Sequence, residues 1–82
     1  MTDEEKIIRG NRARELLNDE VMTGAYAMVE AQAIEELLAA DPLNDALRCV
    51  MVERINALRN VKQALVSVVT TGRAAALRNS GA

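Results

Sequence analysis

The single proline of the chain, Pro42, lies between two long segments in which apolar residues recur every three or four positions. This spacing puts the apolar residues on one side of an α-helix, so we predict helices over about 20–40 and 42–71. Proline is favoured at the first helical position, and Asp41 immediately before it is a strong N-cap residue. The sequence therefore predicts a turn near Ala40, with the second of these helices starting at Pro42.

Two helices joined by a short turn pack as an antiparallel αα-hairpin. At a rise of 1.5 Å per residue, the helix over 42–71 is about 45 Å long and the helix over 20–40 is about 30 Å long. The longer helix therefore extends beyond its partner. Its C-terminal half is left for an N-terminal helix, or for another subunit, to cover.

The residues before this hairpin form a further helical segment. Thr2 followed by Glu5 is a capping box, and it predicts a helix over about 3–18. Its apolar residues lie at roughly helical spacing and are Ile7, Ile8, Ala13, Leu16 and Leu17. Asn18 and Asp19 are candidates to cap the next helix, but they leave open whether the first two helices are continuous.

Composition favours the same fold class. Tyr26 is the only aromatic residue, and the chain has four glycines. A core of thin aliphatic side chains suits helix–helix packing, and so few glycines and prolines do not serve a β fold with many turns. We predict an all-α, three-helix domain over 1–78, with a loose tail over 79–82. A chain of 82 residues builds only a small core, so we also expect self-association or a protein partner.

The last part of the chain reads VVTTGRAAALRN (68–79). It lacks the G-x-x-x-x-G-K-[ST] spacing of a phosphate-binding loop. Gly72 after a periodic apolar run, followed by Arg73, is typical of a helix C-terminus, so we predict that the long helix stops near Thr71. Residues 73–78 then form a short helix of their own, or the long helix continues through Gly72.

Residues that carry chemistry are scarce. The chain has no histidine, and Cys49 is its only cysteine. This removes Cys/His zinc sites and the commonest general base. Glu35 and Glu36 point in different directions on a helix, which favours a solvated acidic face over a carboxylate metal site. We therefore expect no catalytic residue, no metal and no cofactor. The polar N-terminus and the short apolar runs predict neither a signal peptide nor a membrane span.

Charge is divided unevenly along the chain. The net charge of −2 is made up of +1 over 1–14, −8 over 15–53 and +5 over 54–82. Residues 54–82 contain no acid, and this basic block has three interpretations. It pairs with the acidic block 15–53 inside the molecule, it docks on another subunit, or it binds nucleic acid. The acidic net charge and the lack of aromatic residues for base stacking count against nucleic acid.

The antiparallel hairpin makes the first of these interpretations specific. Lys62 is expected opposite Glu20, and Arg54 near Glu30. Because Arg54 interrupts the apolar stripe, it either reaches out from the edge of the interface or forms a buried ion pair with Glu30. Exposed pairs contribute only about 0–1 kcal/mol each, yet the pattern selects the antiparallel register.

Two further side chains have expected places in the hairpin. Tyr26 is predicted to cap the hairpin core near Leu58 or Val61. Cys49 is predicted to be a half-buried small apolar residue, because nothing nearby activates its thiol.

Several stretches resemble a known group of proteins. They are IIRG (7–10), A-x-x-L-L-N-D (13–19), the Ala-rich segment over 20–40 with Ile34, and residues 65–72 around VVTTG. Together they are similar to small, mostly uncharacterised α-helical proteins of tailed bacteriophages whose genes lie among the head and DNA-packaging genes. The resemblance covers 7–78. It implies a role in the virion or its assembly, an oligomeric context, and a location in the host cytoplasm or the virion.

The sequence therefore predicts a non-enzymatic helical protein that self-associates or docks on a larger assembly, with a phage head or packaging accessory as the narrower interpretation. A small DNA-binding packaging or regulatory factor that uses the basic segment 54–78 is the alternative. The residues predicted to make the contact lie in the C-terminal part of the chain: Arg54, Leu58, Val61, Lys62, Leu65, Val68, Arg73, Leu77 and Arg78.

Overall fold

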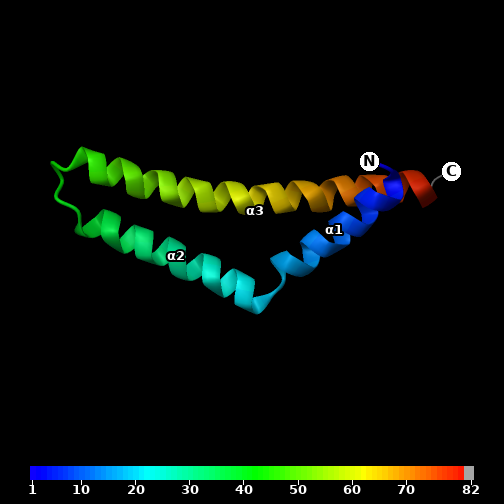
Figure 1. The fold of residues 1–82 in the computed structure, drawn as a ribbon, viewed down its shortest axis with the longest axis horizontal. Helices are drawn as coiled ribbons and strands as arrows, with labels where there is room; N and C mark the ends of the chain where they lie inside the picture. The colour runs from blue at the N-terminus through cyan, green and yellow to red at the C-terminus, as the bar shows by residue number, and fades with distance from the viewer. Residues whose placement is uncertain (81–82) are drawn as a thin grey trace.

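Three α-helices make up the fold, as the sequence predicts (Figure 1). The computed structural model describes residues 1–80, in which α1 spans Asp3–Leu17, α2 spans Glu20–Ala39 and α3 spans Asp45–Ser80. α2 and α3 form the antiparallel hairpin, and α1 packs against the C-terminal half of α3. The all-α fold class, with both shorter helices packed along a long C-terminal helix, is thereby confirmed.

α1 and α2 are separate helices joined by a short corner, which answers the question that the sequence leaves open. The Thr2 side chain accepts a hydrogen bond from the Glu5 N–H at 3.1 Å, so the predicted cap of α1 is confirmed. Asn18 closes α1, and the Asp19 side chain caps α2 by accepting a bond from the Met22 N–H at 2.8 Å. Because of this corner, α1 and α2 follow one another along α3 (Figure 1).

The turn between α2 and α3 is longer than the sequence predicts. The Asp41 side chain accepts a hydrogen bond from the Leu43 N–H at 2.9 Å, within the turn itself. The Asp41 carbonyl oxygen accepts another from the Asn44 N–H at 2.8 Å. The Asn44 side chain then accepts a backbone N–H bond at 3.2 Å and caps α3, which starts at Asp45. The predicted start at Pro42 is therefore wrong, because the aspartate and proline belong to the turn and Asn44 supplies the cap.

α3 also ends later than predicted. It continues through Gly72 as far as Ser80, so the predicted end near Thr71 is wrong, and the alternative of a helix that continues through Gly72 is confirmed. No glycine of the described chain has a positive φ, so Gly72 is not a left-handed cap. The tail predicted over 79–82 begins as helix up to Ser80, and its last two residues lie outside the described part of the chain.

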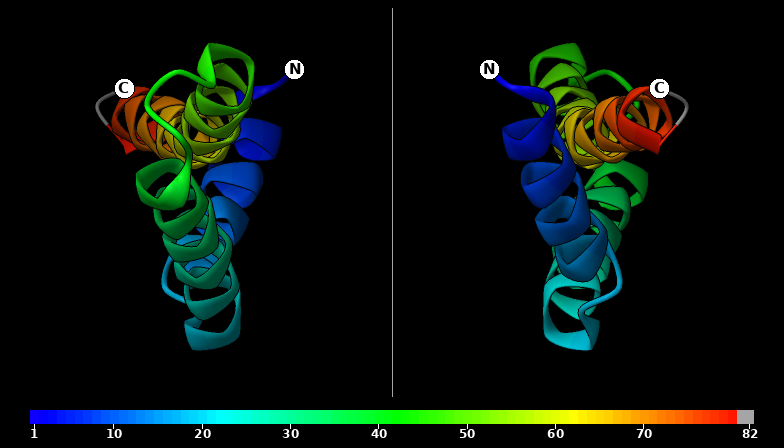
Figure 2. Two further views of the ribbon diagram at one scale, coloured as in Figure 1. Left: turned by 90° about the vertical axis from the view of Figure 1, so that its left-hand side faces the viewer. Right: turned by 90° about the vertical axis from the view of Figure 1, so that its right-hand side faces the viewer.

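The molecule is long and narrow. Its Cα atoms extend over 60 × 23 × 16 Å with a radius of gyration of 17.5 Å, whereas a compact chain of this length has a radius of about 12 Å. The end views in Figure 2 show α1 and α2 on the same side of α3, so the fold has no third layer. The buried apolar residues of the described chain are few and mostly small, namely Ala13, Ala33, Met51, Ile55 and Ala75. Within 1–80, no helix is both long enough and apolar enough to cross a membrane.

Candidate interaction surface

α1 and α3 cross at two glycines that bring their backbones into contact. A Cβ atom on Gly72 would lie 2.8 Å from the Lys6 carbonyl oxygen and 2.9 Å from the Gly10 Cα. A Cβ atom on Gly10 would lie 2.9 Å from the Gly72 Cα and 3.2 Å from the Val68 carbonyl oxygen. Neither position therefore has room for a side chain. Gly72, interpreted from the sequence as the end of a helix, is instead the place where α1 packs backbone to backbone on α3.

Alanines continue this contact one turn along each helix. Ala13 follows Gly10 by three residues and is 3% exposed, and Ala75 follows Gly72 by three residues and is fully buried. This crossing is not among the contacts predicted from the sequence. Its signal is the shared Gly-x-x-Ala spacing, the kind of small-residue pattern that lets helices approach closely.

The apolar residues predicted for the C-terminal half of α3 lie against α1. Leu65 and Val68 are half-buried and line a shallow groove with Ala13 and Leu16 of α1. α1 therefore provides the cover that the sequence assigns either to this helix or to another subunit.

Ion pairs join α2 to α3 across the hairpin. Arg59 Nη2 lies 3.1 Å from Glu30 Oε1, and Arg54 Nη1 lies 3.6 Å from Glu36 Oε2. Pairing between the acidic and basic blocks within the molecule is confirmed for these residues. The specific prediction of Arg54 with Glu30 is wrong, because the later start of α3 shifts the register. A buried pair is wrong as well, since the Arg54 side chain is 57% exposed.

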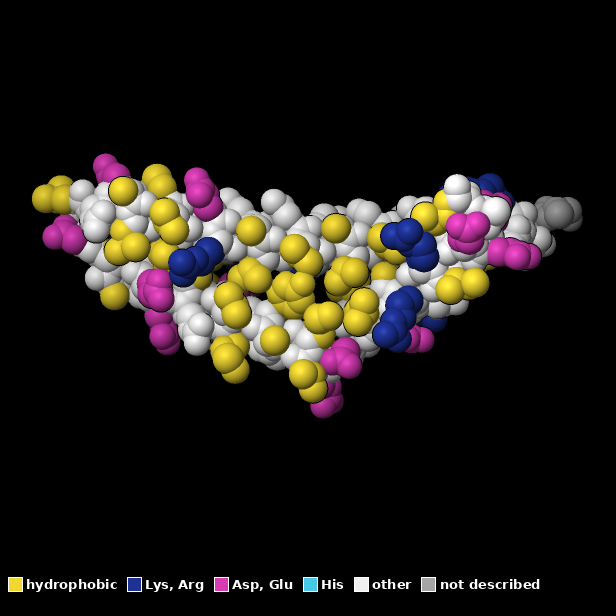
Figure 3. Space-filling view, viewed as in Figure 1, with side chains coloured by type: hydrophobic (Ala, Val, Ile, Leu, Met, Phe, Trp, Pro, Cys, Tyr) yellow, Lys and Arg dark blue, Asp and Glu magenta, His cyan; other side chains and the backbone are white. Residues whose placement is uncertain are grey.

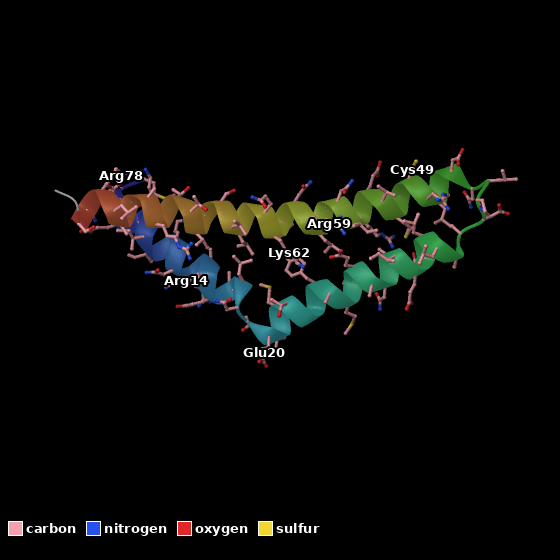
Figure 4. All side chains as sticks on the ribbon, turned by 180° about the vertical axis from the view of Figure 1, so that it is seen from behind. Arg14, Glu20, Cys49, Arg59, Lys62 and Arg78 are labelled. Atoms are coloured by element: carbon pink, nitrogen blue, oxygen red, sulfur yellow. The ribbon has the colours of Figure 1, made fainter. Side chains whose placement is uncertain are left out.

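Lys62 and Tyr26 lie in the space between α2 and α3. The Lys62 Nζ is 5.7 Å from the centroid of the Tyr26 ring, a cation–π distance, and Figure 4 shows Lys62 above α2. Lys62 is therefore opposite Tyr26 and not Glu20, owing to the same shift in register. Tyr26 lines a shallow groove with Leu58, as predicted.

The C-terminal part of α3 is fastened to the start of α1. Arg78 donates from Nη2 to Asp3 Oδ1 at 3.0 Å and from Nε to Asp3 Oδ2 at 3.4 Å. The hydrogen bond from Arg78 lowers the pKa of Asp3 below its ordinary value of 3.8, and the same bond raises the pKa of Arg78. Two more residues in this part of α3 are predicted to contact a neighbour. Arg73 is exposed, and Leu77 is 72% exposed.

Cys49 is an exposed free thiol, so the prediction of a half-buried residue is wrong. It precedes the buried Met51 by two residues, which is more than half a turn round α3, and its side of the helix faces solvent. Figure 4 shows Cys49 close to the hairpin turn.

One broad side of the molecule carries exposed apolar side chains over much of its length. We call it the valine face and define it by the exposed residues Val29, Leu47, Val50 and Val61, with the half-buried Val68 at its α1 end. Val50 and Val61 are both 45% exposed and lie eleven residues apart, about three turns, so they share one side of α3. Figure 3 shows hydrophobic side chains gathered along α3 and at the centre of this side.

An ion pair places the α2 valine on the same side as the α3 valines. Val29 lies two turns before Glu36, and Val61 lies two turns after Arg54. Since Glu36 and Arg54 contact each other, Val29 and Val61 belong to one surface. Val61 and Val68 are among the contact residues predicted from the sequence, whereas Val29, Leu47 and Val50 are not.

Nothing in the described part of the chain adds a metal centre to this surface. No group of three or more Cys, Asp or Glu side chains is placed to hold an ion within 1–80. Comparisons of the chain with protein-family models, with curated proteins and with solved structures found no match.

Proposed function

We propose that this chain is an architectural protein, a non-enzymatic subunit that works by associating with other copies of itself or with a larger protein assembly. The observation that carries the proposal is the extent of its surface. The chain exposes 6009 Å², whereas a compact chain of 8.9 kDa exposes about 4,800 Å². The excess of about 1,200 Å² on one chain is more than the roughly 800 Å² that each partner buries in a standard protein interface.

Much of the uncovered surface is apolar. Val21 is 82% exposed, Leu38 is 80% exposed and Leu43 is 90% exposed, in addition to the side chains of the valine face. Single exposed apolar residues are normal on any protein. An elongated molecule with several exposed apolar residues on one broad side, and charged residues such as Arg54 and Glu36 beside them, is different, because apolar patches rimmed by polar residues are typical of interaction sites.

The narrower proposal is an accessory of a phage head or of DNA packaging. Its support is the sequence resemblance over 7–78, and it leads us to expect terminase and portal genes beside the coding gene. Neighbouring genes without any virion component would contradict the narrower proposal and leave the architectural one in place.

Nucleic-acid binding is the weaker alternative. Of the five cations in 54–78, Arg54, Arg59 and Arg78 pair with acids of the chain, and Lys62 lies over Tyr26. A phosphate backbone would have to compete with these contacts. If the alternative is right, duplex DNA binds the chain at low salt and the affinity falls steeply as salt rises.

The mass of the protein in its natural surroundings tests the architectural proposal. We expect the chain in a gentle extract of its source to sediment well above its own 8.9 kDa, as part of a defined assembly. The same sedimentation run on the purified chain separates self-association from docking on other proteins. A chain of 8.9 kDa in both samples, over the whole range of concentration, would contradict the proposal.

A further inference from the structure

The valine face is large enough to take a second chain. It belongs to the 60 × 23 Å side of a molecule that is only 16 Å thick (Figure 3). A standard interface buries about 800 Å² on each partner. Burial of that area would bring the exposed surface from 6009 Å² to near the value of a compact chain of this mass.

The two ends of the molecule carry opposite net charge. The hairpin half, residues 18–62, has eight acidic and four basic side chains, a net charge of −4. The other half, residues 1–17 and 63–82, has four acidic and six basic side chains, a net charge of +2. Two copies that lie antiparallel bring unlike halves together, whereas two parallel copies bring like halves together.

Charged residues on the same side as the valines repeat this arrangement locally. Arg9 and Arg12 line the groove that contains Val68. Glu36 contacts Arg54 and so lies at its level along α3, which is toward the hairpin turn from Val61, whereas Val68 lies toward the C-terminus from Val61. Val68 and Arg54 are each seven residues from Val61, so a twofold axis through Val61 puts Glu36 of one copy at the level of Arg9 and Arg12 of the other.

We propose that the valine face docks on the valine face of a second copy of this chain, forming an antiparallel, twofold-symmetric dimer with Val61 at its centre. This deepens the proposed function and rests on it, since it names one surface and one partner for the association. Isologous contacts of this kind use the same patch on both subunits, so Val61 of one copy meets Val61 of the other.

Four valines of α3 provide a matched test. Val50 and Val61, both 45% exposed, lie on the valine face, and Val52 and Val66, 44% and 42% exposed, lie on the opposite side of the same helix. Val61→Glu puts two like charges together at the axis, and we expect it to raise the dissociation constant of the dimer about a hundredfold or more. Val66→Glu makes the same chemical change on the far side and should leave the dissociation constant within about threefold of wild type. Sedimentation equilibrium gives the constant, and circular dichroism confirms that each variant is helical.

Cys49 reports the orientation without any substitution, because it is the only cysteine and is exposed outside the valine face. It lies twelve residues from Val61, about 18 Å along α3, so spin labels on the two copies of an antiparallel dimer are about 40 Å apart. A parallel dimer puts the labels at one level and about 20 Å apart across two helix layers. A distance near 20 Å would overturn the proposed orientation.

The outcomes separate this proposal from the one on which it rests. If Val66→Glu dissociates the dimer and Val61→Glu does not, the face is wrong and the architectural role stands. A purified wild-type chain that stays monomeric overturns the dimer. If that monomer sediments with a larger assembly in the natural extract, the architectural role survives. A monomer in both samples removes both proposals.

Discussion

The two halves of α3 are covered in different ways. At the C-terminal half, α1 crosses at Gly10 and Gly72 with its backbone against the backbone of α3. At the N-terminal half, α2 packs on α3 where the longer α3 side chains Met51 and Ile55 are buried, with ion pairs between the two helices. The first contact allows no added atom, and the second depends on side-chain volume. The two halves should therefore respond in opposite ways to gain and loss of volume.

The largest effect is expected where volume is added to the glycine crossing. Gly72→Val places methyl groups against the Lys6 and Gly10 backbones and should lower the free energy of unfolding by about 3 kcal/mol. Gly24→Val is the matched control, since Gly24 is also inside a helix and a Cβ atom there meets nothing within 4 Å. It should change stability by less than about 0.5 kcal/mol. Urea denaturation followed by circular dichroism measures both, and equal losses would show that the crossing is not the tight contact.

Coupling between the glycines sharpens the same point. Gly10→Ala and Gly72→Ala each force α1 away from α3, so the second substitution costs less once the first is present. We expect a coupling free energy of about 1 kcal/mol in a double-mutant cycle. Additive losses would mean that the two residues act separately.

The next effect is expected where volume is removed from the hairpin. Met51 is 2% exposed, and Met51→Ala should cost about 2 kcal/mol, the lower end of the usual range because a thin structure can close round a small cavity. Val52→Ala, at an exposed position next to it, should cost less than about 0.5 kcal/mol. The same denaturation measurement applies, and a loss for Met51→Ala no greater than that for Val52→Ala would contradict the packing described for this half.

These contacts also show how far sequence reasoning reaches. The three helices follow from local signals, since apolar periodicity and the Thr2 and Asp19 caps each involve a few neighbouring residues. The start of α3 was missed because Asp41 and Asn44 are both good caps and the choice depends on which hydrogen bonds the turn makes. That choice also sets the register, so the partner of Arg54 was missed with it.

The candidate surface is harder to predict for a different reason. Gly72 has its role only because Gly10, sixty-two residues earlier, lies against it, and a local pattern carries no such information. The path of α1 along α3 then decides which sides of α3 remain exposed to solvent. Val61 was predicted from its periodicity, but Val50 and Val29 join it only once the helices are placed.

A smaller effect is expected from the cation–π contact between Lys62 of α3 and Tyr26 of α2. Lys62→Met keeps most of the side-chain stem and removes the charge over Tyr26, so we expect a loss of about 0.5–1 kcal/mol. In a Tyr26→Leu background the same substitution should have almost no effect. A double-mutant cycle in urea gives the coupling, and a cost for Lys62→Met that persists without the tyrosine would assign it to packing instead.

The smallest effect is expected at the Asp3–Arg78 pair, and its pH dependence identifies it. Because the folded pKa of Asp3 is lowered below 3.8, the carboxylate contributes stability that is fully present above that value. The contribution is lost as the pH falls through the folded pKa. Asp3→Asn should therefore be slightly less stable than wild type at pH 7, and the difference should vanish in strong acid. Glu4→Gln removes a neighbouring acid of the same helical turn and controls for the charge at the start of α1. If thermal melts of the two variants change with pH in the same way, the bond from Arg78 does not hold this end of α1 on α3, and the glycine crossing and the apolar contacts next to it keep the two helices together.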